Sequence, residues 1–296
     1  TAEGYDIALD CGSGFRNCAN DLQAKWGDKN ERHIHIFGSH SHFDHTEGFD
    51  QAVVCFDPRN KIHIYGNYQF LYSLDSYLGI FSRLVKDDVI CVQTPINYSI
   101  MPASFEGVEF RDLTEATFTG KEKHTFWRVH NINEFIEIGA TRITAFEVYH
   151  PAPCLGYKIE HGGKTFVFCT DHELRHSNDS DDPKQSVSKQ ADERLIAHAM
   201  GADILYRDGQ YLRSEYDGLS GIGSSSPVER VDWGHSCIED VQEMAERCGV
   251  KKTYIGHHDP NREWSERNWI DETLARTCKD REEKIELARA GTVIDL

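Results

Sequence analysis

The sequence predicts an α/β fold in a single domain that spans residues 1–296. Two observations carry this prediction. Between Tyr5 and about His150, short runs rich in β-branched and aromatic residues alternate with stretches of helical spacing, as in α/β proteins. The conspicuous histidines and aspartates also follow strand-like runs directly, and the ends of strands are where α/β sheets place their sites.

The first half of the chain contains clear strand and helix patterns. Residues 33–37 (HIHIF) alternate as a strand does, and Gly38 ends the run before a histidine-rich loop. Residues 61–65 predict the next strand, and residues 69–85 an aromatic-rich helix. Between residues 89 and 147 we expect mainly strands, including 126–129 and 141–148.

The second half begins with a predicted β-hairpin over residues 157–169, whose turn contains Gly162 and Gly163 and which leads to Asp171. Residues 177–190 are polar and predict a loop, followed by a helix over 191–200.

The predicted C-terminal helix begins at a capping box, in which Ser236 and Glu239 would bond backbone amides at the helix start. Gly249 ends this helix, and the strand over residues 253–256 then leads directly to His257.

The composition fits a globular protein and disfavours a long nucleic acid as partner. Hydrophobic residues make up 39% of the chain and charged residues 27%, which is ordinary for a chain with a buried core. The formal net charge is -17, which would repel an extended polyphosphate backbone. Small anionic substrates are compatible with this charge.

The nine cysteines occur singly, without a CxxC pair, which predicts reduced thiols in a cytoplasmic protein. No run approaches the roughly 20 apolar residues that span a bilayer, and no basic-then-apolar leader opens the chain. We therefore expect a soluble protein without a membrane partner. The chain begins at Thr1 rather than Met, which leaves open whether native residues precede it.

The strongest chemical signal is the HxHxDH pattern at residues 40–45. His40, His42, Asp44 and His45 offer imidazole nitrogens and a carboxylate, which zinc accepts at about 2.0 to 2.2 Å. Two histidines one residue apart can face the same ion, while the following Asp-His pair turns toward a neighbouring one. We therefore interpret this loop as a metal site rather than as a solvated polar turn.

With this loop, the sequence resembles the metallo-β-lactamase fold superfamily over essentially the whole chain. Five motifs match in the expected order, which makes the resemblance specific. They are Asp10 in LDCGSG, the HxHxDH loop, His150, Asp171 in CTD, and His257 in GHHDP. The implied fold is a four-layer αβ/βα sandwich of two mixed sheets.

The resemblance also implies a pair of metal ions. Two Zn2+ ions fit best, and Mn2+ or Fe suits the same donors. The implied ligands form two sets: His40, His42 and His150 for one ion, and Asp44, His45 and His257 for the other. Asp171 would bridge the ions, while Asp10 would orient loop residues through hydrogen bonds. We favour His257 over His258 because it follows the strand directly.

Residues 232–236 (DWGHS) resemble the ribonuclease Z and cyclic-nucleotide phosphodiesterase branch, in which a Gly-His-Ser segment supplies a histidine near the scissile phosphate. Residues 208–211 (DGQY) extend the match. His235 is therefore a candidate general acid or transition-state stabiliser, because an imidazole can donate a proton or carry positive charge near neutral pH. Glu173 or Asp208 would orient it.

These features predict a metal-dependent phosphodiesterase that acts on a small nucleotide phosphodiester, and a 3',5'-cyclic nucleotide fits best. His235, Asp44 and Asp171 would carry catalysis. The aromatic segment 65–81 can stack on a base, although an amphipathic core helix is the simpler interpretation.

Three alternatives stay open: a ribonuclease Z-like endonuclease acting on RNA, an acyl hydrolase for thioesters, lactones or lactams, and a degenerate domain that binds without catalysis. The branch also allows a homodimer, which no sequence feature settles.

Overall fold

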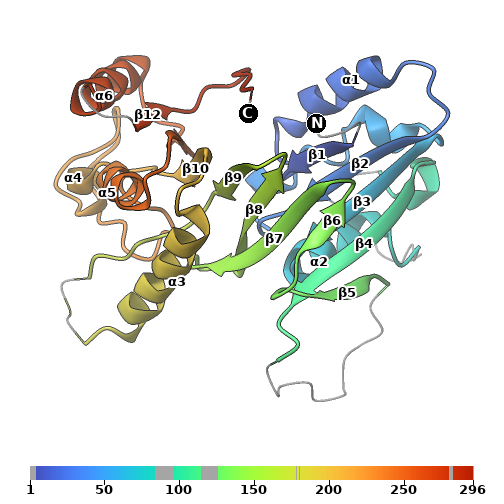
Figure 1. Cartoon of the computed structure of the whole chain (residues 1–296), viewed down its shortest axis with the longest axis horizontal. Helices are drawn as coiled ribbons and strands as arrows, with labels where there is room; N and C mark the ends of the chain where they lie inside the picture. The colour runs from blue at the N-terminus through green and yellow to red at the C-terminus, as the bar shows by residue number, and fades with distance from the viewer. Residues whose placement is uncertain are drawn as a thin grey trace. The chain divides into compact units, whose positions relative to one another are not determined.

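A computed structural model describes residues 5–83, 96–114, 126–177, 179, 181–279 and 283–295 (Figure 1). The chain divides into two compact units, Thr1–Ala140 and Thr141–Leu296, and each is described by itself. Three sequence-based predictions fall outside the described residues. These are the start at Thr1, the part of the predicted helix beyond Arg83, and the parts of the strand-rich region 89–147 that lie at residues 89–95 and 115–125.

The first unit is built on a parallel sheet. Its strands are β1 (Asp6–Leu9), β2 (Arg32–Phe37), β3 (Asn60–Gly66), β4 (Ser104–Arg111) and β5 (Arg128–Asn131), hydrogen-bonded in that order. All four neighbouring pairs run parallel. The strands predicted at 33–37 and 61–65 are confirmed as β2 and β3. Of the two mixed sheets that the resemblance implies, this one is parallel throughout.

Helices α1 and α2 cover one face of this sheet. The remaining elements of the unit are α1 (Phe15–Trp26), α2 (Tyr68–Leu78), the short 3-10 helices η1 (Phe43–His45), η2 (Val53–Phe56) and η3 (Tyr98–Ile100), and β6 (Ile136–Ile138). Because side chains alternate along a strand, Ile34 and Ile36 of β2 point to the same face, where they join a core with Phe15 of α1 and Leu71 of α2. The burial of this core holds the carboxyl end of β2, and hence the loop after it, in place.

Helix α2 ends earlier than the sequence pattern predicts. It stops at Leu78, where Gly79 adopts a left-handed conformation with φ of 65°. The Asp75 carboxylate then accepts hydrogen bonds from the amides of Phe81 and Ser82, at 2.8 and 2.9 Å. These bonds stabilise a turn where the apolar spacing alone suggested that the helix continues.

The second unit contains a mixed sheet. The strands of this sheet that belong to the second unit are β7 (Thr141–Val148), β8 (Cys154–His161), β9 (Lys164–Cys169), β10 (Ile204–Asp208), β11 (Lys252–Gly256) and β12 (Lys284–Leu287), in the order β12-β11-β10-β9-β8-β7. Strand β8 is antiparallel to β7 and β9, whereas β9 to β12 run parallel. The predicted hairpin is confirmed as β8 and β9. Strands β7, β9, β10 and β11 therefore all end at the same edge of the sheet.

The helices of this unit are α3 (Pro183–Ala199), α4 (Arg213–Tyr216), α5 (Ile238–Cys248) and α6 (Trp264–Thr277). The polar stretch that predicts a loop to residue 190 is helical from Pro183 onward. Asp182 caps α3 by accepting from the Lys184 amide at 2.9 Å, and proline is favoured at the first helical position. The predicted capping box is also displaced by one residue, because Asp240 accepts from the Cys237 amide at 3.3 Å.

Two further expectations can be compared with the described residues. Eight cysteines lie among them; all are free thiols, and all but Cys18 are buried. In the same part of the chain, no helix is both long and apolar enough to cross a membrane.

Candidate metal centre

In the first unit, the predicted ligands lie on the loop that follows β2. The imidazole of His40 is fully buried, and its ring centroid lies 4.5 Å from that of His42 and 4.3 Å from that of His45. The Asp44 carboxylate is 3.2 Å from Nε2 of His45. This unit alone therefore gathers three imidazoles and one carboxylate, as the HxHxDH pattern predicts.

Asp10 orients this loop by hydrogen bonds. Its carboxylate accepts from Nδ1 of His45 at 2.8 Å, and from the amide and hydroxyl of Ser39 at 2.6 and 2.9 Å. The Ser39 hydroxyl, having donated to Asp10, accepts from Nδ1 of His40 at 3.0 Å. Both histidines thus carry their proton on Nδ1, which leaves Nε2 as the donor atom for a metal.

Gly12 of the LDCGSG motif lets the loop after β1 approach the HxHxDH loop closely. A Cβ atom on Gly12 would lie 1.8 Å from the carbonyl oxygen of Asp44, so any other residue would push the loops apart. The amide of Cys11 also donates to the carbonyl of His45 at 3.0 Å. Asp10 itself has φ of 60°, a strained value for a non-glycine residue at a strand end.

In the second unit, Asp171 lies between two histidines. Its side chain is buried, with Oδ1 at 3.2 Å from Nε2 of His257 and Oδ2 at 3.9 Å from Nε2 of His150. The two oxygens of one carboxylate therefore face two different imidazoles. His257 has φ of 55°, so this unit also bears backbone strain at a predicted ligand.

The tautomer of His150 follows from its partner. Its Nδ1 lies 3.0 Å from the carbonyl oxygen of Gly234, and a carbonyl can only accept, so Nδ1 carries the proton. Nε2, which faces Asp171, is then the unprotonated nitrogen. A Cβ atom on Gly234 would lie 2.1 Å from Nδ1 of His150, so glycine is required for this close approach.

The structure also distinguishes His257 from His258. Nε2 of His258 lies 3.3 Å from the carbonyl of Ala288, and burial lowers the pKa of this imidazole. Nε2 of His257, by contrast, lies 3.2 Å from the Asp171 carboxylate, where the predicted metal site needs a donor.

His235 joins the same cluster of the second unit. Its ring stacks on that of His257 with centroids 4.6 Å apart, and donor atoms of Asp171, His235 and His257 all lie within 4.8 Å of one another. Its Nδ1 lies 2.8 Å from Oδ2 of Asp208, which is buried at the end of β10. Of the two partners that the sequence left open, Asp208 therefore bonds the ring, and Glu173 does not.

Sequence reasoning missed the roles of two serines. Ser39 links Asp10 to His40, and its position directly before the first ligand was the available signal. Ser236 was interpreted as a helix cap, but its hydroxyl donates to the carbonyl of His172 at 2.5 Å. A capping pattern and a loop contact use the same residue type, so the pattern did not distinguish them.

The donor set fits a divalent transition metal. Each unit offers imidazole nitrogens and carboxylate oxygens. In His40, His45 and His150, a hydrogen bond at Nδ1 fixes the orientation of the ring and leaves Nε2 as the donor atom for a metal. These donors suit zinc and also manganese or iron, so the residues do not select one metal.

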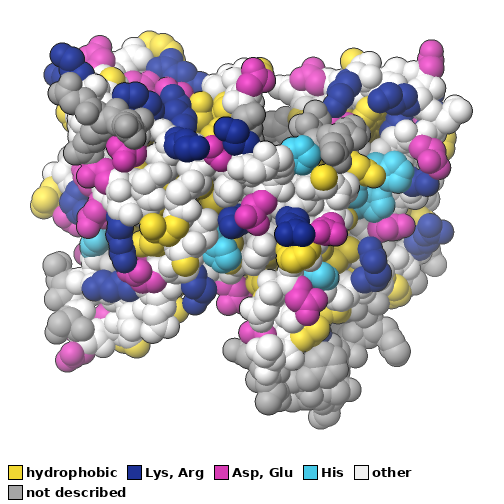
Figure 2. All heavy atoms as spheres, in the orientation of Figure 1, with side chains coloured by type: hydrophobic (Ala, Val, Ile, Leu, Met, Phe, Trp, Pro, Cys, Tyr) yellow, Lys and Arg dark blue, Asp and Glu magenta, His cyan; other side chains and the backbone are white. Residues whose placement is uncertain are grey.

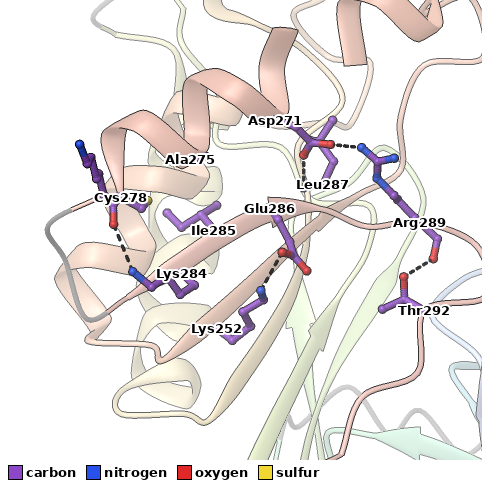
Figure 3. A pocket seen from close by; sticks show the side chains of 11 residues that line it. Lys252, Asp271, Ala275, Cys278, Lys284, Ile285, Glu286, Leu287, Arg289 and Thr292 are labelled. Atoms are coloured by element: carbon purple, nitrogen blue, oxygen red, sulfur yellow. Dashed lines mark hydrogen bonds and ion pairs between the residues drawn. The ribbon is translucent and has the colours of Figure 1, made fainter. Parts of the chain in front are cut away.

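A pocket of about 470 Å³ lies elsewhere in the second unit, between α6 and β12 (Figure 3). Two of its cations are already paired with acids, since Lys252 lies 2.7 Å from Glu286 and Arg289 contacts Asp271. None of the predicted ligands lines this pocket. It is separate from the candidate metal centre.

Among known proteins, solved structures resemble this chain, whereas no family model and no curated protein sequence matches it. Among solved structures, the metallo-β-lactamase fold protein YhfI from Bacillus subtilis aligns with a TM-score of 0.57 and 15% identity, over 99% of this chain and 88% of YhfI.

Two further structures give similar values. A diphosphatase from the PhnP family aligns with a TM-score of 0.55 and 16% identity, over 100% of this chain and 82% of its own. The short form of human tRNase Z aligns with a TM-score of 0.56 and 15% identity, over 100% of this chain and 90% of the tRNase Z chain. The chain therefore has the metallo-β-lactamase fold.

Proposed function

We propose that the chain is a dinuclear metal-dependent phosphodiesterase that hydrolyses a small nucleotide phosphodiester, with a 3',5'-cyclic nucleotide as the substrate that fits best. The observation that carries this proposal is Asp171, whose two oxygens face two different imidazoles next to His235. A carboxylate so placed is suited to bridge two ions. Two solved structures with the same fold are named as a diphosphatase and a tRNase, which supports chemistry at phosphorus.

The proposed ligands are those that the family resemblance implies. A catalytic zinc ion takes three protein ligands and keeps a position for water, so two ions need two sets of ligands. We assign the ligands in two sets: His40, His42 and His150 for one ion, and Asp44, His45 and His257 for the other. Asp171 would bridge them.

When bound, such a pair of ions activates water and neutralises charge on phosphoryl oxygens. As ligands, Asp44 and Asp171 would hold the ions in position for this chemistry. His235 donates a proton to the leaving ribose oxygen or stabilises its negative charge through Nε2, because Nδ1 is committed to Asp208. The Asp208 carboxylate holds the ring in place.

The surface of α2 supports a substrate that carries a base. The core interpretation of this helix is confirmed by its buried Phe70 and Leu74, yet Tyr68 and Tyr72 are 36% and 54% exposed. Their rings lie nearly parallel, with centroids 5.6 Å apart. The helix cap Asn67 donates to the carbonyl of Ser39 at 3.3 Å, which ties this end of α2 to the ligand loop. Such aromatic surfaces bind bases by stacking.

Charge supports a small substrate over a long one. The formal net charge is -17, and on the face shown in Figure 2 basic and acidic side chains are intermixed. Long RNA is bound through extended basic surfaces. The tRNase Z-like alternative therefore takes second place, supported by the shared fold.

The direct test measures metal content together with turnover. Protein loaded with Zn2+ or Mn2+ is assayed on bis(p-nitrophenyl) phosphate, on a panel of 3',5'-cyclic nucleotides, and on a tRNA precursor at the same metal concentration. We expect about two ions per chain and turnover of a cyclic nucleotide. Faster cleavage of the tRNA precursor would favour the endonuclease, and a protein that holds no metal would refute both.

A further inference from the structure

Glu173 is a buried carboxylate that binds the turn before His235 rather than His235 itself. It lies two residues after Asp171 and is fully buried. One oxygen accepts from the amide of Asp232 and the other from the amide of Gly234, each at 2.9 Å. The first oxygen also accepts from the hydroxyl of Tyr216. All three partners are donors, as a carboxylate requires.

The turn that Glu173 holds has an unfavourable backbone. Asp232 has φ of 69° and Gly234 has φ of 92°, both in the left-handed half of conformational space. A non-glycine residue there costs about 1–3 kcal/mol and persists only when its surroundings enforce it. The two amide contacts to Glu173 provide that enforcement. Burial, and then the bond to Glu173, raises the pKa of Tyr216, so this phenol remains a donor.

The conformation of this turn determines which ring nitrogen of His150, a predicted metal ligand, carries the proton. The carbonyl of Gly234 accepts from Nδ1 of His150 at 3.0 Å, and so selects the tautomer whose Nε2 faces Asp171. The residue after Gly234 is His235, so the same turn also sets the position of that ring. A shift in the turn would therefore change both histidines together.

Ser236 joins the same two segments at a second point. Its hydroxyl donates to the carbonyl of His172 and accepts from the amide of Leu174 at 3.1 Å. Nη2 of Arg207 lies 3.2 Å from the same oxygen. The loop after Asp171 thus holds the turn through Glu173, and the turn holds the loop through Ser236.

We propose that Glu173 is a positioning residue that acts through the turn at residues 232–234 to fix the metal-binding tautomer of His150 and the location of His235. The inference rests on the proposed metal-binding role of His150. Both oxygens of Glu173 accept from the turn or from Tyr216, so its effect is transmitted by the Gly234 carbonyl and by the chain direction at His235.

The test compares Glu173→Gln with Glu215→Gln. Glu215 is a matched control because it is also a buried carboxylate of the second unit that accepts from a backbone amide, that of Leu212 at 2.7 Å, but it pairs with Arg262 and contacts none of the predicted ligands. A glutamine at 173 presents an amide group to backbone N–H donors, which removes one of the two contacts. Both variants should lower the thermal midpoint.

Two readouts separate positioning from general stability. In metal-free protein, imidazole NMR should show the Nδ1-protonated tautomer of His150 in the wild type and in Glu215→Gln, and a mixture of tautomers in Glu173→Gln. Zn2+ affinity from chelator competition should fall about 10- to 100-fold in Glu173→Gln alone, the range found when a partner of a ligand is removed. The tautomer measurement does not depend on turnover, so it tests this inference even if the proposed substrate is wrong.

Variants of Ser236 keep the test decisive if Glu173→Gln does not fold. Ser236→Ala should shift the His150 tautomer and weaken Zn2+ binding in the same direction, whereas Ser236→Thr retains the hydroxyl and should restore both. A folded Glu173→Gln or Ser236→Ala protein with the wild-type tautomer and wild-type Zn2+ affinity would overturn the proposal.

Discussion

The two units supply predicted metal ligands in different ways. In the first unit, four ligands lie within residues 40–45, and one carboxylate, that of Asp10, orients the loop through Ser39 and His45. In the second unit, the ligands lie between positions 150 and 257 and come from the ends of three strands. Their orientation depends on contacts among separate loops, including the Gly234 carbonyl on His150.

This difference indicates how each set responds to change. A short loop held by one acid should tolerate mutations elsewhere, because its geometry is local. A set assembled from distant strand ends should be sensitive at every loop that fixes it. The largest losses are therefore expected in the second unit.

Removing the carboxylate between two imidazoles should be the most damaging change. For Asp171→Ala we expect kcat/KM on bis(p-nitrophenyl) phosphate to fall about 10³-fold or more, because misplacing the ions costs several kcal/mol and each 1.4 kcal/mol is tenfold. Metal content by mass spectrometry should fall as well. Asp203→Ala, which removes a carboxylate paired with Lys251, serves as control. Normal metal content in Asp171→Ala would argue against a bridging role.

Removing His235, the proposed proton donor, should lower turnover without removing a predicted metal ligand. For His235→Ala we expect a loss of about 10²-fold in kcat on phosphodiesters, within the range for general acid catalysis. Hydrolysis of a thioester or lactone should change little. If His235→Ala retains phosphodiester turnover and hydrolyses acyl substrates faster than phosphodiesters, the result would favour the acyl hydrolase alternative.

Asp10 and Asp208 each orient a histidine, but Asp10 should mainly control metal affinity and Asp208 mainly control kcat. Asp10→Asn should weaken Zn2+ binding about 10- to 100-fold, because it disturbs the hydrogen bonds that fix His45 and His40. Asp208→Asn should mainly lower kcat, since its partner is His235. Chelator competition and steady-state kinetics on the same preparations measure both effects. Equal losses of metal affinity in the two variants would remove the distinction between the units.

The exposed tyrosines should act on substrate affinity only. Tyr72→Ala should raise KM for a cyclic nucleotide about fivefold, from about 1 kcal/mol of lost stacking, with kcat retained. A phosphodiester without an aromatic group should show no change. Tyr5→Ala, at another exposed tyrosine of the first unit, is the matched control. An unchanged KM in Tyr72→Ala would refute the stacking surface.

Histidines outside the ligand loop should affect stability against pH rather than activity. Burial, together with the neighbouring His63 and His33, lowers the pKa of His35 to about 3. Below the ordinary value of 6.5, the unfolded chain binds a proton that folded His35 does not, so the free energy of unfolding decreases as the pH falls from 6.5 toward 3. The slope from this group is at most about 1.4 kcal/mol per pH unit.

Denaturant unfolding of His35→Asn between pH 7 and pH 4 measures this effect. The variant should lose less stability on acidification than the wild type, with turnover at neutral pH retained. A wild-type pH dependence would show that other groups dominate acid unfolding.

The sequence by itself determined the fold class and the ligand loop of the first unit. The HxHxDH pattern is local, and the alternation in β2 fixes which way the loop is presented, so both can be recognised without tertiary information. The five ordered motifs likewise predicted the metallo-β-lactamase fold that the structural comparison shows. Local spacing also predicted the hairpin that leads to Asp171.

Only the tertiary structure decided how the second unit holds its ligands. Asp208 rather than Glu173 bonds His235, and Ser236 contacts a loop instead of capping α5. These outcomes depend on hydrogen bonds between residues far apart in the chain, and a carboxylate or hydroxyl can serve a helix cap, a turn or an imidazole equally well. Which partner it takes is fixed by the packing of strands and loops, which local sequence patterns do not record.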